Sequence, residues 1–198
     1  MKTRFLFTGT LVILLLLAVT VSALAAPASS TVYRFSDASE VPGASASLVR
    51  ADGNVSMTLR TSELDQNAAY TVWWVIFNNP IDCSSTCGED DIFDEKGLIV
   101  NDDGTFGTPG VNVSAVFAAG HVVGKNGVGN FGAGLREGKT SGALFGPGLV
   151  DAQGAEIHLI VRSHGELIPG MVNKQISTEP GGCSINDCVD QQFAVFTP

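Results

Sequence analysis

The chain has 198 residues, of which 20 are acidic and 11 are lysine or arginine, so its formal net charge at pH 7 is −9. Nucleic acids and anionic membrane surfaces bind basic patches, and this acidic balance therefore argues against both as partners. Glycine is abundant, with 23 residues spread along the chain, which favours many turns between short strands.

The first 25 residues have the pattern of a secretory signal peptide. A short basic start precedes an apolar run that is densest at residues 11–19, and the small residues Ala23 and Ala25 fit a signal peptidase site. The apolar run is shorter than the ~20 residues that a membrane-spanning helix needs, and no basic cluster follows it. We therefore predict a cleaved signal peptide at residues 1–25 and a single secreted domain, without a membrane span, at residues 26–198.

Strand patterns dominate the rest of the chain. Residues 44–50 and 55–61 flank an Asp52-Gly53 turn signal, and the second of these segments alternates apolar and polar side chains, as a strand with one wet face does. Residues 69–77 are apolar on both faces, which predicts a central strand covered on both sides. Further strands are predicted at residues 97–100, 111–123, 127–135, 156–164 and 192–196.

Two adjacent tryptophans, Trp73 and Trp74, lie within the 69–77 segment. Neighbouring residues of a strand face opposite ways, so the two indoles are predicted on opposite faces of the sheet. We favour burial of both, because aliphatic residues surround them. An indole on an open face would instead be placed to stack on a sugar or on a partner's apolar surface.

The four cysteines occur in two close pairs. In an exported chain an even number of cysteines predicts disulfides, although four residues allow more than one connectivity. We favour two local bridges, Cys83–Cys87 and Cys183–Cys188, because each pair flanks a short turn. A zinc site of four thiolates is the alternative, but the spacing within each pair differs from the usual two intervening residues, and an exported chain favours disulfides.

The acidic loop after the first cysteine pair is a candidate calcium site. Asp90, Asp91 and Asp94 crowd carboxylates into one short segment, and calcium prefers several carboxylate and carbonyl oxygens that converge within a loop. The spacing of the EF-hand loop is absent. A solvated acidic loop is the alternative that we favour.

The three histidines, His121, His158 and His164, are candidate ligands for a transition metal. His158 and His164 fall on one face of the predicted 156–164 strand, together with Glu156. Six residues of strand cover ~20 Å, so these two imidazoles cannot share one ion unless the strand bends sharply. Either could still join His121 from a neighbouring strand. We favour the alternative that all three are ordinary strand histidines, hydrogen-bonded to their neighbours.

The sequence contains no constellation that predicts catalysis. The Gly-x-Ser-x-Gly motif is missing, and the adjacency of Ser163 and His164 carries no meaning because catalytic triads are assembled in space. The cysteines are expected to be oxidised, which removes a thiolate nucleophile. The glycines of residues 124–129 match no phosphate-binding or dinucleotide-binding pattern and fit a hairpin better. We therefore predict that the protein is not an enzyme.

The spacing of strands and turns predicts an all-β fold. Glycine and proline interrupt the chain at short intervals, and no segment of ten or more residues after the signal peptide has a persuasive helical stripe. We expect a Greek-key-like β-sandwich or a partly open barrel of about seven to nine strands.

Several stretches resemble a group of uncharacterised secreted proteins, mostly bacterial. The resemblance covers nearly all of residues 26–198, and the group brings no known activity. It rests on Tyr70–Pro80 (YTVWWVIFNNP) followed by Cys83, on Ala155–Gly165 (AEIHLIVRSHG), on Gly181–Cys183 and on Gln192–Phe196.

The order of strands resembles, more distantly, the chordin-type (CHRD) domain and the copper/zinc superoxide dismutase sandwich. In those families a strand after the second hairpin carries a His-x-His or similar pair. The comparable residues here, 71–75, contain no histidine. The resemblance therefore implies a sandwich fold and carries over neither copper ligands nor dismutase activity.

These observations predict a secreted, disulfide-bonded β-sandwich module that binds an extracellular ligand or protein surface, or that forms part of an extracellular or envelope layer. Its location would be extracellular, or periplasmic if the source is a Gram-negative bacterium. No cofactor is predicted. The alternative is a metal-binding protein or metal-dependent enzyme that uses calcium or a transition metal, held by the candidate residues His121, His158, His164, Asp90, Asp91 and Asp94.

Overall fold

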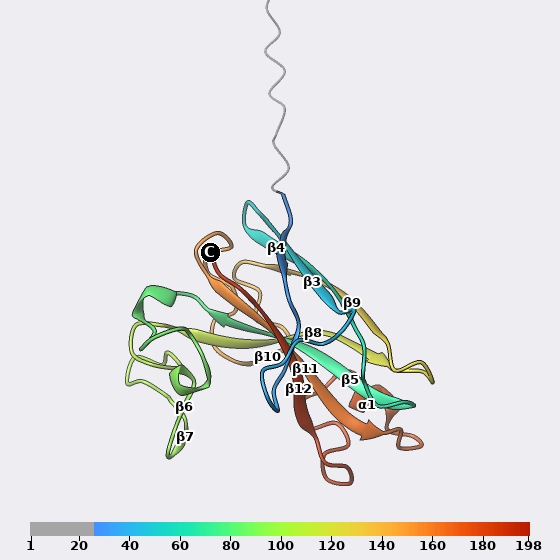
Figure 1. The fold of residues 1–198 in the computed structure, drawn as a ribbon. Coiled ribbons are helices and arrows are strands. Elements are labelled where there is room, and N and C mark those ends of the chain that lie inside the picture. Colours follow the sequence, from blue (N-terminus) through green and yellow to red (C-terminus); the bar gives the residue numbers. More distant parts are fainter. Residues whose placement is uncertain (1–25) are drawn as a thin grey trace, which may run out of the picture.

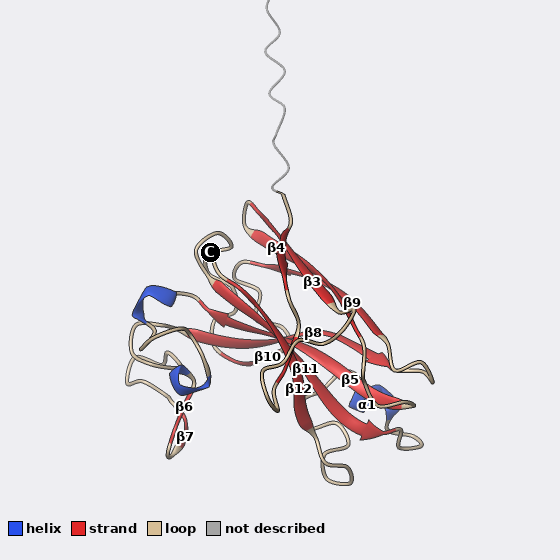
Figure 2. Cartoon of the chain, viewed as in Figure 1, coloured by secondary structure: helices blue, strands red, loops and turns tan. Residues whose placement is uncertain are grey.

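A computed structural model describes residues 26–198 of the chain, and the predicted signal peptide lies outside this range. The described part is an open, all-β sandwich, as the sequence predicts (Figures 1 and 2). Every strand pair is antiparallel, and no closed barrel forms within residues 26–198. In the same range, no helix has the length and apolarity that crossing a membrane requires.

Two large sheets form the sandwich, and a small hairpin of β6 (Phe93–Asp94) and β7 (Gly97–Leu98) projects from one end. The four-stranded sheet has the order β1 (Ala28–Ser30), β3 (Ser45–Ala51), β4 (Asn54–Thr61) and β9 (Gly129–Arg136). The six-stranded sheet has the order β10 (Ala143–Phe145), β8 (Val113–Val122), β5 (Ala68–Phe77), β11 (Glu156–Glu166), β12 (Val189–Phe196) and β2 (Tyr33–Arg34).

The main core lies between the two sheets. β4 contributes alternate residues to it, as its period of two predicts. From the six-stranded sheet, alternate residues of the central strands β5 and β11 complete the core, including Trp74 and Leu159, which are 1% and 0% exposed. The other face of β5 and β11 points away from the four-stranded sheet, and we call it the outer face.

Two long connections cover opposite ends of the outer face (Figures 1 and 2). Residues 78–112 join β5 to β8 and contain the 3-10 turns η1 (Pro80–Asp82) and η2 (Glu89–Asp91) together with the β6–β7 hairpin. Residues 167–188 join β11 to β12 and contain the one short helix of the described chain, α1 (Val172–Gln175). We call these segments the first cap and the second cap.

The second cap docks closely on β8 because Gly120 has no side chain. A Cβ atom at Gly120 would lie 1.7 Å from the carbonyl oxygen of Ile176, just after α1. Such an approach is possible only for glycine, and the contact is to backbone rather than to a flexible side chain. Gly120 therefore sets the distance between the second cap and the sheet.

The predicted strands all occur, with small differences in their ends. The predicted 97–100 strand is shorter, because only Gly97–Leu98 pair with β6. The strands that sequence reasoning did not predict, β1, β2, β6 and β10, have two or three residues each. They bring the count of strands in residues 26–198 to twelve, above the predicted seven to nine.

Candidate functional site

A groove of about 730 Å³ runs across the outer face, between the two caps. We call it the outer-face groove. Its floor is built from alternate residues of β5, β11 and β12, because a strand sends every second side chain to the same face. Trp73 and Val75 come from β5, Ile160 from β11, and Phe193 and Val195 from β12.

Trp73 is the largest side chain of the groove floor. Its indole is 5% exposed, packs edge-on against Phe117 at 5.6 Å between ring centroids, and donates a hydrogen bond from Nε1 to Thr71 Oγ1 at 2.9 Å. Trp74 points the opposite way, into the main core. The predicted placement of the two indoles on opposite faces is confirmed. Trp73 is also held in one orientation by its hydrogen bond.

Glu156 and His158 form a polar pair at the end of the groove next to the first cap. They lie two residues apart on the outer face of β11, each is 9% exposed, and His158 Nε2 lies 2.8 Å from Glu156 Oε1. The imidazole also packs against the ring of Phe77, with 4.9 Å between centroids. Within residues 26–198, the bond between His158 Nε2 and Glu156 Oε1 is the only hydrogen bond of either side chain.

Arg162 lies at the other end of the groove, next to the second cap. Its guanidinium contacts Glu179 at 3.0 Å and Asp190 at 2.8 Å. The Nε atom of Arg162 is buried and has no hydrogen-bond partner among the described residues. Because two carboxylates flank one guanidinium, this end of the groove has a net negative charge.

The first cap is built around a disulfide and a small core of its own. Cys83 and Cys87 are bonded as predicted. Cys87 and Ile92 pack with Phe77 of β5, so the cap rests directly on the outer face. The exposed ring of Phe93, which is 44% exposed, stands at the edge of the groove. The cap therefore forms one wall of the groove.

Asp91, one of the candidate calcium ligands, holds together several segments of the first cap. Its carboxylate accepts hydrogen bonds from the backbone N–H groups of Ser84 at 2.9 Å and Gly88 at 3.1 Å, and from Thr108 Oγ1 at 3.2 Å. The residue is 1% exposed. Burial on its own would raise the pKa of Asp91, but these donors outweigh it and hold the pKa below its ordinary value.

We expect Asp91 to make the first cap sensitive to acid. The pKa of Asp91 is lower in the folded protein than in the unfolded chain, so its ionised carboxylate stabilises the fold above the ordinary carboxyl pKa of about 4. This stabilisation is lost as the pH falls through the lower, folded value of the pKa. Replacing Asp91→Asn should remove this dependence. Urea unfolding monitored by circular dichroism from about pH 6 down to pH 2 checks it, with Asp90→Asn, an exposed neighbour, as control. Equal pH dependence in the wild type and Asp91→Asn would contradict the assignment.

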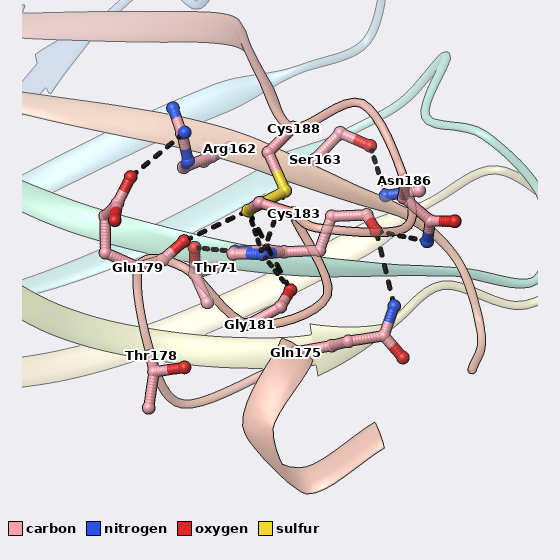
Figure 3. Close-up of a disulfide and its surroundings, with 12 residues drawn as sticks. Thr71, Arg162, Ser163, Gln175, Thr178, Glu179, Gly181, Cys183, Asn186 and Cys188 are labelled. Carbon is pink, nitrogen blue, oxygen red and sulfur yellow. Dashed lines mark hydrogen bonds and ion pairs between the residues drawn. A yellow bond between two sulfur atoms is a disulfide. The ribbon is translucent and has the colours of Figure 1, made fainter. Parts of the chain in front are cut away.

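The second cap is closed by the other predicted disulfide, Cys183–Cys188 (Figure 3). The two sulfur atoms lie 3.8 and 3.6 Å from His164 Nδ1. His164 is fully buried. Its Nδ1 lies 2.8 Å from the carbonyl oxygen of Gly181, and its Nε2 lies 2.8 Å from Thr71 Oγ1. Because a carbonyl only accepts, we assign the ring proton to Nδ1, and the Thr71 hydroxyl then donates to Nε2.

This arrangement links the second cap to the groove floor. The indole of Trp73 donates to Thr71, Thr71 donates to His164, and His164 donates to Gly181 in the cap. Burial, together with the positive charge of Arg162, lowers the pKa of His164 below its ordinary value, which favours the neutral ring that this chain of hydrogen bonds requires. The second cap therefore orients Trp73 through two intermediate side chains.

The structure does not gather the predicted metal ligands into one site. His121 is exposed on β8 and packs against Phe131 of the four-stranded sheet, at 5.9 Å between ring centroids. His158 lies in the groove and His164 beneath the second disulfide. In the acidic loop, Asp91 is buried, whereas Asp90 and Asp94 are exposed.

One group of potential ligand atoms does come together. His164, Cys183 and Cys188 place one nitrogen and two sulfur atoms within 4.8 Å of each other, and no other group of three such residues does so in residues 26–198. The two sulfur atoms are joined in a disulfide and offer no thiolate. All four cysteines are bonded in this way, so the alternative of a four-thiolate zinc site is wrong.

Sequence reasoning placed Glu156, His158 and His164 on one strand face but did not identify the groove. Two aromatic residues of its lining, Phe35 and Phe193, pack together at 4.9 Å between ring centroids but come from distant segments. A signal for the polar pair was present, because an acid and a histidine two residues apart on a strand face the same side.

Comparisons with protein-family models, with curated proteins and with solved structures gave no significant match. The function is therefore argued from the outer-face groove alone.

Proposed function

We propose that the protein is an exported binding module that takes a small, mainly apolar ligand in the outer-face groove. The observation that carries this proposal is the groove itself, a concave, largely apolar space of about 730 Å³ with a few polar groups at its two ends. Grooves that bind small molecules have this size and this distribution of polar groups. The secretory pattern of residues 1–25 and the two disulfides support export.

A small molecule suits the groove better than a peptide. Most of the floor lies on β5 and β11, and each of these two strands is paired on both sides. Their backbone N–H and C=O groups are used in the sheet, so an extended peptide would find no free backbone partners there. Recognition must come from side chains, which favours a ligand with little hydrogen-bonding capacity along its body.

The walls of the groove are pre-formed. Each cap is closed by its own disulfide, and the second cap is fixed on the sheet by the close contact at Gly120. Walls that are already ordered reduce the conformational entropy lost on binding. Caps that are already ordered in this way support a binding role.

We expect the neutral apolar probe N-phenyl-1-naphthylamine to bind with one-to-one stoichiometry and to increase in fluorescence. Ile160→Gln places a polar amide on the groove floor and should weaken binding roughly fivefold, about the effect of 1 kcal/mol of lost apolar contact. The matched control is Ile81→Gln, because Ile81 is 85% exposed and lies outside the groove lining. Fluorescence titration measures all three proteins.

Two results would overturn the proposal. One is the absence of saturable one-to-one binding to the wild type. The other is equal affinity in the Ile160→Gln and Ile81→Gln variants, which would place the probe elsewhere on the surface. Circular dichroism spectra of both variants should match that of the wild type, since Ile160 is outside the main core.

A further inference from the structure

This inference rests on the proposed function and names the class of ligand. We infer that the ligand is an amphiphilic amine, whose protonated nitrogen pairs with the carboxylate of Glu156 while its apolar body lies over Trp73 and Ile160.

The carboxylate of Glu156 has few hydrogen-bond partners. A carboxylate has two oxygens and about four acceptor positions, yet Glu156 makes one hydrogen bond in the described chain, from His158 to Oε1. The residue is 9% exposed and stands opposite Phe77 on the neighbouring strand. A carboxylate with so few partners in an apolar setting is costly unless a donor or a positive charge is supplied.

The Oε2 atom of Glu156, which accepts no hydrogen bond, is accessible from the groove. Within residues 26–198, the only buried side-chain nitrogen or oxygen atoms without a hydrogen-bond partner are Asn112 Oδ1 and Arg162 Nε. Glu156 Oε2 also has no hydrogen-bond partner but is not one of these fully buried atoms, so part of its surface is exposed. Glu156 lines the groove, and a ligand there can therefore reach Oε2.

The lining of the outer-face groove carries more negative than positive charge. Besides Glu156, the groove is lined by Glu89, Glu179 and Asp190. Arg162 is the only lysine or arginine in the lining, and it is already flanked by two of these acids. The excess of negative charge favours a positively charged ligand and disfavours an anionic one.

Apolar side chains of the groove floor lie next to the pair of Glu156 and His158. On the floor, Val75 stands opposite His158, and Ile160 stands between Trp73 and Phe193 on the two neighbouring strands. The ring of Phe35 packs against that of Phe193. An apolar chain or ring can lie along these side chains with its amine at Glu156. Aromatic faces near a cation add to the attraction. A protonated amine also supplies N–H donors, which a carboxylate with a free oxygen can accept.

The test compares three probes with one apolar body, 4-phenylbutylamine, 4-phenylbutanol and 4-phenylbutyrate, by isothermal titration calorimetry at about pH 8. We expect the amine to bind roughly tenfold more tightly than the alcohol, as a charge-assisted hydrogen bond of about 1.4 kcal/mol would give. The carboxylate should bind more weakly than the alcohol. Glu156→Gln should remove the preference for the amine over the alcohol, whereas the exposed control Glu95→Gln should keep this preference.

The outcomes separate this inference from the proposed function. If the alcohol or the carboxylate binds the wild type as tightly as the amine, the groove binds ligands but the inference about the amine is wrong. A preference for the amine that survives in Glu156→Gln also overturns it. If none of the three probes binds the wild type, the proposed function fails as well. The comparison of probes on the wild type stands even if Glu156→Gln does not fold.

Discussion

Replacing Trp74 by alanine is expected to lower the free energy of unfolding by about 3–5 kcal/mol, because it removes the largest fully buried side chain of the main core. The indole lies between the two sheets and is 1% exposed, so the space that it leaves is sealed from solvent. The variant loses both the transfer free energy of the indole and the contacts around the resulting cavity. Urea unfolding monitored by far-ultraviolet circular dichroism measures the change without relying on tryptophan fluorescence.

Trp73→Ala is the matched control, because the same side chain is removed from the neighbouring position on the opposite face. The space left by Trp73 opens into the groove, and water can fill it. We expect the free energy of unfolding to fall by a smaller amount, roughly 2 kcal/mol, which is mainly the transfer free energy of the indole. The same variant should bind the neutral probe poorly. If Trp73→Ala were as destabilising as Trp74→Ala, the outer face would be a closed core and not a groove.

Replacing Gly120 by alanine should displace the second cap and destabilise the protein by about 3 kcal/mol, at the upper end of the usual cost of overpacking. The added methyl group would lie 1.7 Å from the carbonyl oxygen of Ile176, and its nearest neighbours are all backbone atoms of Ile176, so no flexible side chain can move aside. Amide hydrogen exchange should rise in residues 172–188 and change little in the four-stranded sheet, because the contact is local.

The control for this variant is Gly134→Ala on β9. A Cβ atom at Gly134 would lie 3.7 Å from its nearest neighbour, the carbonyl oxygen of Val55, which is an ordinary contact. Its backbone lies in an extended strand, so alanine should be neutral or slightly stabilising. Equal stability of the wild type and Gly120→Ala would show that the second cap is not held closely against β8.

The strands were predictable because their signals are local. Alternating side chains in β4 and the apolar run of β5 each predict a strand without knowledge of its partners. The missed strands β1 and β10 are too short to show a period. They pair because β3 and β8 already present free edges to them, which is a property of the assembled sheet.

The candidate site was predictable in its parts but not as a whole. Cysteine spacing predicts both disulfides correctly, since each closes a short loop. The shared face of Glu156 and His158 follows from the period of a strand. Whether that face meets solvent, a second sheet or a groove depends on the two caps, and their irregular sequences have no period that indicates where they fold.

The structural role of Asp91 was also not predictable from the sequence. In the sequence it is one acid in a run that also includes Asp90 and Asp94. Only the turn at η2 distinguishes it, because that turn brings its carboxylate beneath the N–H groups of Ser84 and Gly88. Its neighbours remain in solvent, so charge alone could not separate a structural acid from a surface one.

The placement of the disulfides has a consequence for how this scaffold can diversify. Each bridge joins cysteines only four or five positions apart, inside one cap, and neither ties the caps to the sandwich or the sheets to each other. Each bridge therefore stabilises the fold of its own cap only, and the caps are held on the sheet by non-covalent contacts such as those at Phe77 and Gly120. A change within one cap would alter one wall of the outer-face groove and leave the paired strands of the floor in place.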